Sequence, residues 1–117
     1  MVETEYRLEG FRDVTLDANG EASIVAIGPT RPNERWKITR FSVNTTSACD
    51  FQVFRGNTLD SQYQIDFTTK GAGDTSETDL PLSVGETISF RWSEGVPNAT
   101  GTIRWEGSYF VPGRRAY

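Results

Sequence analysis

The chain has 117 residues, of which 36% are hydrophobic and 12% aromatic, a size that fits one domain with a thin core. A formal net charge of −4 argues against nucleic acid as the main partner, because phosphate binding favours an excess of Lys and Arg. Cys49 is the only cysteine and histidine is absent, which excludes an intrachain disulfide, a Ser-His triad and most zinc sites.

Apolar and polar residues alternate along most of the chain, and Gly, Pro, Asn and Asp interrupt them at intervals of roughly ten residues, which is typical of an all-β protein. In chain order, we expect strands over residues 4–8, 12–16, 21–27, 35–44, 49–54, 63–67, 88–92 and 102–111. About eight strands without a crossover helix predict a single antiparallel β-sandwich over residues 1–117, jelly-roll-like in its connections.

Two short segments carry predictions of their own. Asn19-Gly20 favours a tight hairpin turn, because both residues tolerate a positive φ. Residues 24–27 are apolar on both faces of the expected strand. They indicate either a central strand covered on both sides or a strand at an oligomer contact.

The parity of each expected strand predicts which side chains face the core. The alternation changes phase near Thr39-Arg40, and a β-bulge there would turn the apolar side chains before and after it inward. The expected inward residues are Trp36, Ile38, Phe41, Val43, Cys49, Phe51, Val53, Tyr63, Ile65, Phe67, Ile88, Phe90, Trp92, Ile103 and Trp105. On the last strand we expect Thr102, Arg104 and Glu106 to point outward, and Gly107 to mark a bulge or bend.

Reactive groups do not form a recognisable catalytic motif. The chain lacks a P-loop and a G-x-S-x-G motif, and no pair among its 16 carboxylates stands out, so we expect neither enzymatic activity nor a cofactor. Asp74 and Ser76 in the polar loop expected over residues 70–76, with Asp79 shortly after it and Asp66 nearby, offer oxygen ligands for calcium, but bonding to the local backbone is the favoured interpretation. The three tryptophans offer either a sugar-stacking platform or core packing, and their inward parity favours the core.

The two ends of the chain carry opposite charges. Glu3 and Glu5 belong to an acidic head, whereas the tail carries Arg114, Arg115 and Tyr117. Residues 1–9 and 112–117 are either solvated ends or extended arms that dock on neighbouring subunits. These five side chains, with Ile24 of the two-faced apolar strand, are the candidate partner-binding residues. The head lacks the apolar segment of a signal peptide, and no run is long enough to span a membrane, so we expect the chain to be made in a cytoplasm and to stay soluble.

Several segments form a pattern of strand starts and turns. They are residues 20–25 leading to Gly28-Pro29, residues 33–38, residues 53–56, residues 73–76, and Leu82-x-x-Gly85-Glu86-Thr87-Ile88-x-Phe90-x-Trp92. Between residues 20 and 107 this pattern resembles small β-sandwich structural proteins of tailed bacteriophages, of the capsid decoration, head-fibre or neck type.

The resemblance implies a capsid decoration protein that forms a homo-oligomer, with a trimer favoured, over joints between subunits of the major capsid protein. Each copy would bind two or more capsid subunits, and multivalency would make modest single contacts strong. The expected location is the virion, with no nucleic acid or membrane as partner. Two alternatives stay open: a neck, tail or fibre component of the same particle, and a carbohydrate-binding module or receptor-binding domain.

Overall fold

The computed structural model describes residues 3–112 of the chain, without the side chains of residues 3, 69, 70 and 72. Its six strands are β1 (Glu3–Thr15), β2 (Ala22–Ile27), β3 (Arg35–Arg55), β4 (Gln64–Ser83), β5 (Ile88–Ser93) and β6 (Thr100–Pro112). One turn of 3-10 helix, η1 (Ser61–Tyr63), precedes β4. All strand pairs are antiparallel, which confirms the predicted all-β class. Within residues 3–112, no helix has the length and apolar character needed to cross a membrane.

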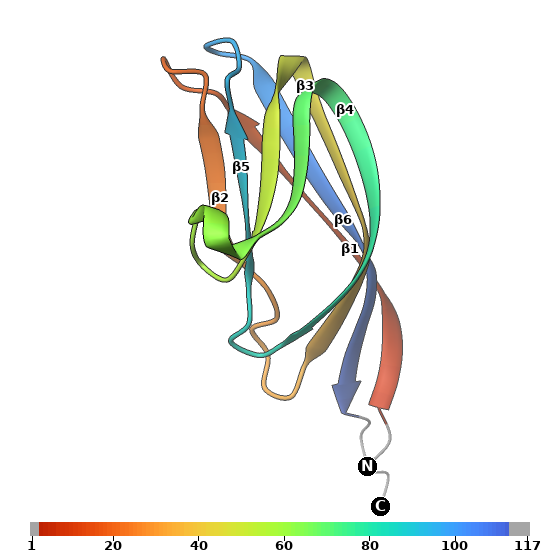
Figure 1. Cartoon of the computed structure of the whole chain (residues 1–117). Coiled ribbons are helices and arrows are strands. Elements are labelled where there is room, and N and C mark those ends of the chain that lie inside the picture. Colours follow the sequence, from red (N-terminus) through yellow and green to blue (C-terminus); the bar gives the residue numbers. More distant parts are fainter. Residues whose placement is uncertain (1–2, 113–117) are drawn as a thin grey trace, which may run out of the picture.

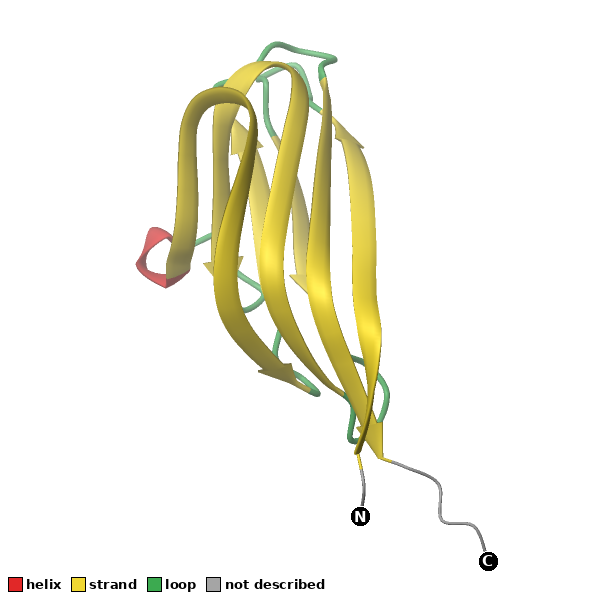
Figure 2. Ribbon diagram, turned by 90° about the vertical axis from the view of Figure 1, so that its right-hand side faces the viewer, coloured by secondary structure: helices red, strands yellow, loops and turns green. Residues whose placement is uncertain are grey.

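Two layers arise because β3 and β4 bend together and contribute to both of them (Figure 1). Residues 35–45 of β3 pair with β6 and with the second half of β4, whereas residues 50–55 pair with β5 and with the first half of β4. One layer therefore has the order β1-β6-β3-β4, and the other has the order β2-β5-β3-β4. Figure 2 shows the long strands running from the bend to the opposite end of the molecule. Because two of the six strands count twice, the sandwich has eight strand segments in a jelly-roll-like arrangement.

The core lies between the two layers and is built around a group of aromatic rings. Phe90 of β5 is central: its ring packs edge-on against Phe41 at 5.8 Å between centroids, and it stacks on Phe51 and Trp105, each at 6.1 Å. Such ring pairs add about 0.5–1.5 kcal/mol each to the effect of the area they bury. Trp36 and Val43 are partly buried and pack against this core. Most of the other predicted inward positions are buried: Ile38, Phe41, Cys49, Phe51, Val53, Ile88, Phe90, Trp92, Ile103 and Trp105.

The predicted β-bulge near Thr39-Arg40 is confirmed. Against β6 the register of β3 shifts between Ile38 and Arg40, so Thr39 is the extra residue in that pair. The register against β4 shifts at the same point in the opposite sense, with Thr78 and Asp79 of β4 opposite Thr39. Gly107 of β6 lies opposite the bulge, where a Cβ atom would overlap the backbone carbonyl of Lys37. The lack of a side chain at Gly107 therefore lets the two strands approach where β3 changes phase.

Several predicted strand boundaries are wrong, because the strands are longer than the alternation indicates. The strands expected over residues 4–8 and 12–16 are one strand, β1, and those over residues 35–44 and 49–54 are both parts of β3. The polar loop expected over residues 70–76 lies within β4, where its backbone pairs with β3. Backbone pairing of this kind does not require apolar side chains, so the polar composition did not reveal the strand.

Two local predictions also need correction. The turn at Asn19-Gly20 forms, with Gly20 at a φ of 71° and the Asn19 backbone N–H donating to the Asp17 carboxylate at 2.8 Å. It joins β1 to β2, which lie in different layers, so it does not close a hairpin of two paired strands. Among the described strands β2 pairs only with β5, so residues 24–27 form an edge strand and not a covered central one.

Candidate functional site

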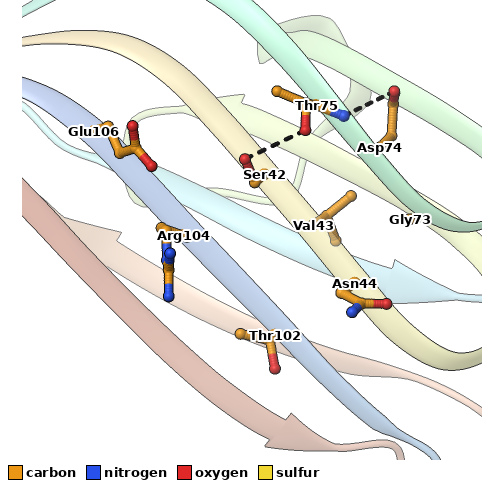
Figure 3. Close-up of a pocket in the computed structure, with 9 residues that line it drawn as sticks. All are labelled: Ser42, Val43, Asn44, Gly73, Asp74, Thr75, Thr102, Arg104 and Glu106. Carbon is orange, nitrogen blue, oxygen red and sulfur yellow. Dashed lines mark hydrogen bonds between the residues drawn. The ribbon is translucent and has the colours of Figure 1, made fainter.

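A shallow groove of about 610 Å³ crosses β6, β3 and β4 on the outer face of the first layer. Figure 3 shows the side chains that line this outer groove and the three neighbouring strands that carry them. The lining residues are Thr102, Arg104 and Glu106 on β6, Ser42, Val43 and Asn44 on β3, and Gly73, Asp74 and Thr75 on β4. The volume is within the range of sites that bind small molecules.

The first row of side chains in the outer groove centres on Arg104. This residue lies in register between Phe11 of β1 and Ser42 of β3, and Ser42 pairs in turn with Thr75 of β4. Directly paired residues point to the same side of a sheet, so all four side chains face the same way. The hydroxyl groups of Ser42 and Thr75 are 3.4 Å apart, within hydrogen-bonding distance, and Phe11 leaves 61% of its surface exposed.

The second row centres on Asn44. Thr102 of β6 pairs with Asn44, which pairs with Gly73 of β4. The Thr102 hydroxyl donates a hydrogen bond to the Asp13 carboxylate of β1 at 2.7 Å, which fixes the Thr102 side chain at the border of the groove. Because Gly73 has no side chain, the space beside the Asn44 amide oxygen stays open on the β4 side.

The cations on this face differ in whether they are paired. Arg40 and Glu77 form an ion pair at 3.8 Å, and Lys37 and Asp79 form another at 3.5 Å. Arg104 is exposed and forms no ion pair with any residue that the structure describes. The outer groove therefore offers one guanidinium group whose donors are available to a ligand.

A second surface feature is an apolar edge row, formed by Tyr63, Ile65 and Phe67. These side chains, predicted to be buried, leave 50%, 44% and 46% of their surface exposed. The prediction is wrong because this part of β4 lies at the edge of its layer and Phe67 pairs with Gln52 on the outer face, away from the core. Among the described strands β4 pairs only with β3, so the backbone along its other edge is open to solvent or to another chain.

The structure describes three of the six predicted partner-binding residues and does not bring them together. Glu3 pairs with Pro112 at the start of β1, so the predicted arm over residues 1–9 is, from Glu3 onward, held to β6 by backbone pairing. Glu5 is exposed and accepts a hydrogen bond from the Ser108 hydroxyl at 2.7 Å, and Ile24 packs partly buried against the core. The remaining three, Arg114, Arg115 and Tyr117, lie outside the described residues with the rest of the predicted C-terminal arm beyond residue 112.

The tryptophans do not form a common exposed platform for a sugar. Trp92 and Trp105 are buried, with 0% and 6% of their surfaces exposed. Trp36 is half-buried, and its indole N–H donates a hydrogen bond to the Glu34 carboxylate at 2.9 Å. Core packing is therefore the role of Trp92 and Trp105, as their parity predicts.

The carboxylate of Asp74 bonds to nearby groups of its own strand. It accepts hydrogen bonds from the Thr68 hydroxyl at 2.7 Å and from the Thr75 backbone N–H at 2.9 Å. Both partners are local, which agrees with the favoured interpretation of this segment. Within the part of the chain that the structure describes, no group of three His, Cys, Asp or Glu side chains is placed to hold a metal ion.

The sequence matches no family model and no curated protein. Among solved structures, the fold is similar to a chain in the acidic stable capsid structure of Helicobacter pylori bacteriophage KHP30. The TM-score is 0.59 at 14% identity, over 96% of this chain and 95% of that one. It is also similar to a chain of the nora virus structure, with a TM-score of 0.55 at 9% identity, over 98% of this chain and 62% of that one.

A third similar fold belongs to the Bacillus endospore appendages, which form disulfide-linked pili. The TM-score is 0.50 at 14% identity, over 97% of this chain and 93% of that one. At these identities the comparisons establish a shared fold and nothing about shared residues. Two of these three chains belong to virus structures, and the other belongs to a pilus.

Proposed function

We propose that this protein is a non-enzymatic structural component of a virus particle, and specifically a capsid decoration protein of a tailed bacteriophage. The observation that carries the proposal is the similarity of the whole sandwich to a chain in a phage capsid structure, which covers 96% of this chain and 95% of that one. A match over nearly the full length of both chains concerns the complete architecture, including the bent β3–β4 ribbon. The pattern of strand starts and turns, which resembles that of phage virion proteins, favours the same function.

The proposed mechanism is cohesive. Each copy contacts two or more subunits of the major capsid protein, and copies associate with one another, with a trimer as the favoured oligomer. Many modest contacts acting together resist dissociation far better than one of them does. The apolar edge row offers such a contact, since three large apolar side chains lie beside an open strand edge that another chain can extend. In this proposal the protein is assembled into the virion in the cytoplasm of the host.

The proposal includes a second position in the same particle, in its neck, tail or fibre. The two positions differ in copy number: a decoration protein is present in hundreds of copies per particle, and a neck or fibre component in a few or a few tens.

Quantitative mass spectrometry of purified particles of the encoding virus tests both levels of the proposal. We expect the chain to co-purify with the particles at a ratio to the major capsid protein near one to one or one to a small integer. A ratio lower by an order of magnitude would move the protein to the neck, tail or fibre. Absence from the particles at every stage of assembly would overturn the virion function itself.

A further inference from the structure

We propose that the outer groove is a binding site for a neutral oligosaccharide, a role beyond the structural one proposed above. The basis is the mixture of groups that three neighbouring strands bring to one face (Figure 3): Arg104, Ser42, Asn44, Thr75, Thr102 and Glu106. A ligand that satisfies this mixture is rich in hydroxyl groups and carries no net charge.

Donors and acceptors lie side by side in the outer groove. The guanidinium of Arg104 only donates hydrogen bonds, the carboxylate of Glu106 only accepts them, and the amide of Asn44 does both. The hydroxyl groups of Ser42 and Thr75, 3.4 Å apart, can each donate or accept. A sugar hydroxyl is itself both a donor and an acceptor, so neighbouring hydroxyls on a sugar ring can match this set where a purely anionic or cationic group cannot.

The charges of the outer groove argue against an ionic ligand. Arg104 and Glu106 are two residues apart on β6 and point to the same side, so their charges offset each other. Asp13 adds negative charge at the β1 border of the groove, where it accepts the hydrogen bond from Thr102. Asp74 pairs with Val43, so its carboxylate is turned to the other side of the sheet. A phosphate or carboxylate would therefore meet net repulsion, and a cation would meet the guanidinium of Arg104. A neutral ligand meets neither the repulsion from the carboxylates nor the repulsion from the guanidinium.

The shape of the groove and its aromatic border agree with an extended saccharide. The groove is open and crosses three strands, and its volume of about 610 Å³ accommodates more than one sugar ring. Phe11 stands beside Arg104 on β1 with 61% of its surface exposed. An aromatic ring in that position provides a flat apolar surface for the C–H face of a sugar, while the polar groups bind its hydroxyls.

An NMR titration of the isotopically labelled full chain tests the proposal. The probes are three neutral tetrasaccharides, built from glucose, N-acetylglucosamine or mannose. We expect at least one of them to shift the backbone amide signals of residues 42–44, 73–75 and 102–106 at concentrations up to about ten millimolar. Arg104→Ala should weaken that binding about ten-fold, because the charged hydrogen-bond donor is lost. The variant should keep its thermal transition, since Arg104 is exposed.

Arg12→Ala is the matched control. Arg12 is also an exposed arginine, but it follows Phe11 on β1 and points to the opposite side of the strand. Weaker binding in Arg104→Ala with unchanged binding in Arg12→Ala supports the proposal. Equal weakening in both variants would indicate a general charge effect and overturn it, as would the absence of groove shifts with all three sugars. Loss of copies from virus particles in Arg104→Ala, with no sugar binding, would make the groove a protein contact instead.

Discussion

Two segments of the layer β2-β5-β3-β4 each carry three large apolar side chains at alternate positions, and they differ completely in exposure. Ile88, Phe90 and Trp92 of β5 leave 0% of their surfaces exposed. The apolar edge row, from η1 into β4, leaves between 44% and 50% of each side chain exposed. β5 lies between β2 and β3 with the opposite layer over its inner side, whereas this part of β4 lies at the edge with its side chains turned outward. Position in the sandwich, and not residue type, decides which row stabilises the fold.

The largest expected effect is that of Phe90→Ala. This change removes a fully buried ring that contacts Phe41, Phe51 and Trp105. We expect the free energy of unfolding to fall by about 3–5 kcal/mol, the usual range for removing a buried phenylalanine ring. Chemical denaturation measures it, with Phe67→Ala as the matched control on the edge row. A similar loss in both variants would contradict the comparison.

Ser89→Ala should have an intermediate effect, because the start of β5 is buried on both sides, with Ser89 on the side away from the core. Ser89 leaves 0% exposed, donates a hydrogen bond to the Gly56 carbonyl at 2.7 Å and accepts one from the Ala26 backbone N–H at 3.2 Å. Its loss leaves both backbone groups without this partner, which should cost about 1–3 kcal/mol of unfolding free energy. Ser42→Ala, at a partly exposed hydroxyl on the outer face of β3, is the control and should cost less than about 0.5 kcal/mol. Equal losses would mean that burial of Ser89 contributes nothing.

The paired change Tyr63→Ser with Phe67→Ser should leave stability nearly unaltered and weaken assembly. Both side chains are about half exposed, so we expect the free energy of unfolding to change by less than about 1 kcal/mol. The number of copies bound per particle should fall, because the apolar contact is removed. Particle binding at the wild-type level would exclude the apolar edge row as a contact while leaving other surfaces of the sandwich to be tested.

The smallest expected effect concerns Glu86, in the turn between β4 and β5. The Ser83 backbone N–H donates to its carboxylate at 2.8 Å and Arg55 lies at 3.3 Å, and together they lower the pKa of Glu86 below 4.5. Because the pKa of Glu86 is lowered in the folded protein, its ionised carboxylate stabilises the fold above about pH 4.5. This stabilisation is lost as the pH falls through the pKa of Glu86 in the folded state.

Glu86→Gln should therefore lower the thermal midpoint slightly at neutral pH, and the difference from the wild type should shrink as the solution is acidified. Glu9→Gln is the control, since Glu9 is an exposed glutamate paired with Arg7 at 3.8 Å. A difference for Glu86→Gln that grows on acidification would have the wrong sign and would refute this account.

Much of the fold is predictable from the sequence, because alternation records the parity of each strand. Ile103 and Trp105 on β6 are assigned to the core correctly, and the bulge at Thr39 is recognisable since apolar residues stand on both sides of the phase change. The continuity of β3 is not predictable in the same way. Residues 44–48 are mostly polar where the strand bends between layers, and such a segment has the composition of a loop.

The candidate site was predictable only in part. The outward direction of Thr102, Arg104 and Glu106 follows from the parity of the last strand. The sequence does not predict that these side chains lie beside Ser42 and Thr75, because that contact depends on which strands become neighbours in the sheet. The contacting residues are far apart in the chain. The apolar edge row shows the same limit: alternation identifies a face of a strand and does not say whether another layer covers it.

The pairing of β1 with β6 has a consequence for how the chain is made. β6 is the last strand among the described residues, yet it lies between β1 and β3 in its layer, so that layer cannot close until residues 100–112 have left the ribosome. At translation rates of about 5–20 residues per second, β1 stays without its partner for roughly 5–20 seconds. A sheet dominated by such distant pairings folds in milliseconds to seconds, so the layer can close soon after residues 100–112 emerge. During synthesis, then, the nascent chain exposes the aromatic residues that later fill the core, and the cell must keep it from aggregating until its final strand arrives.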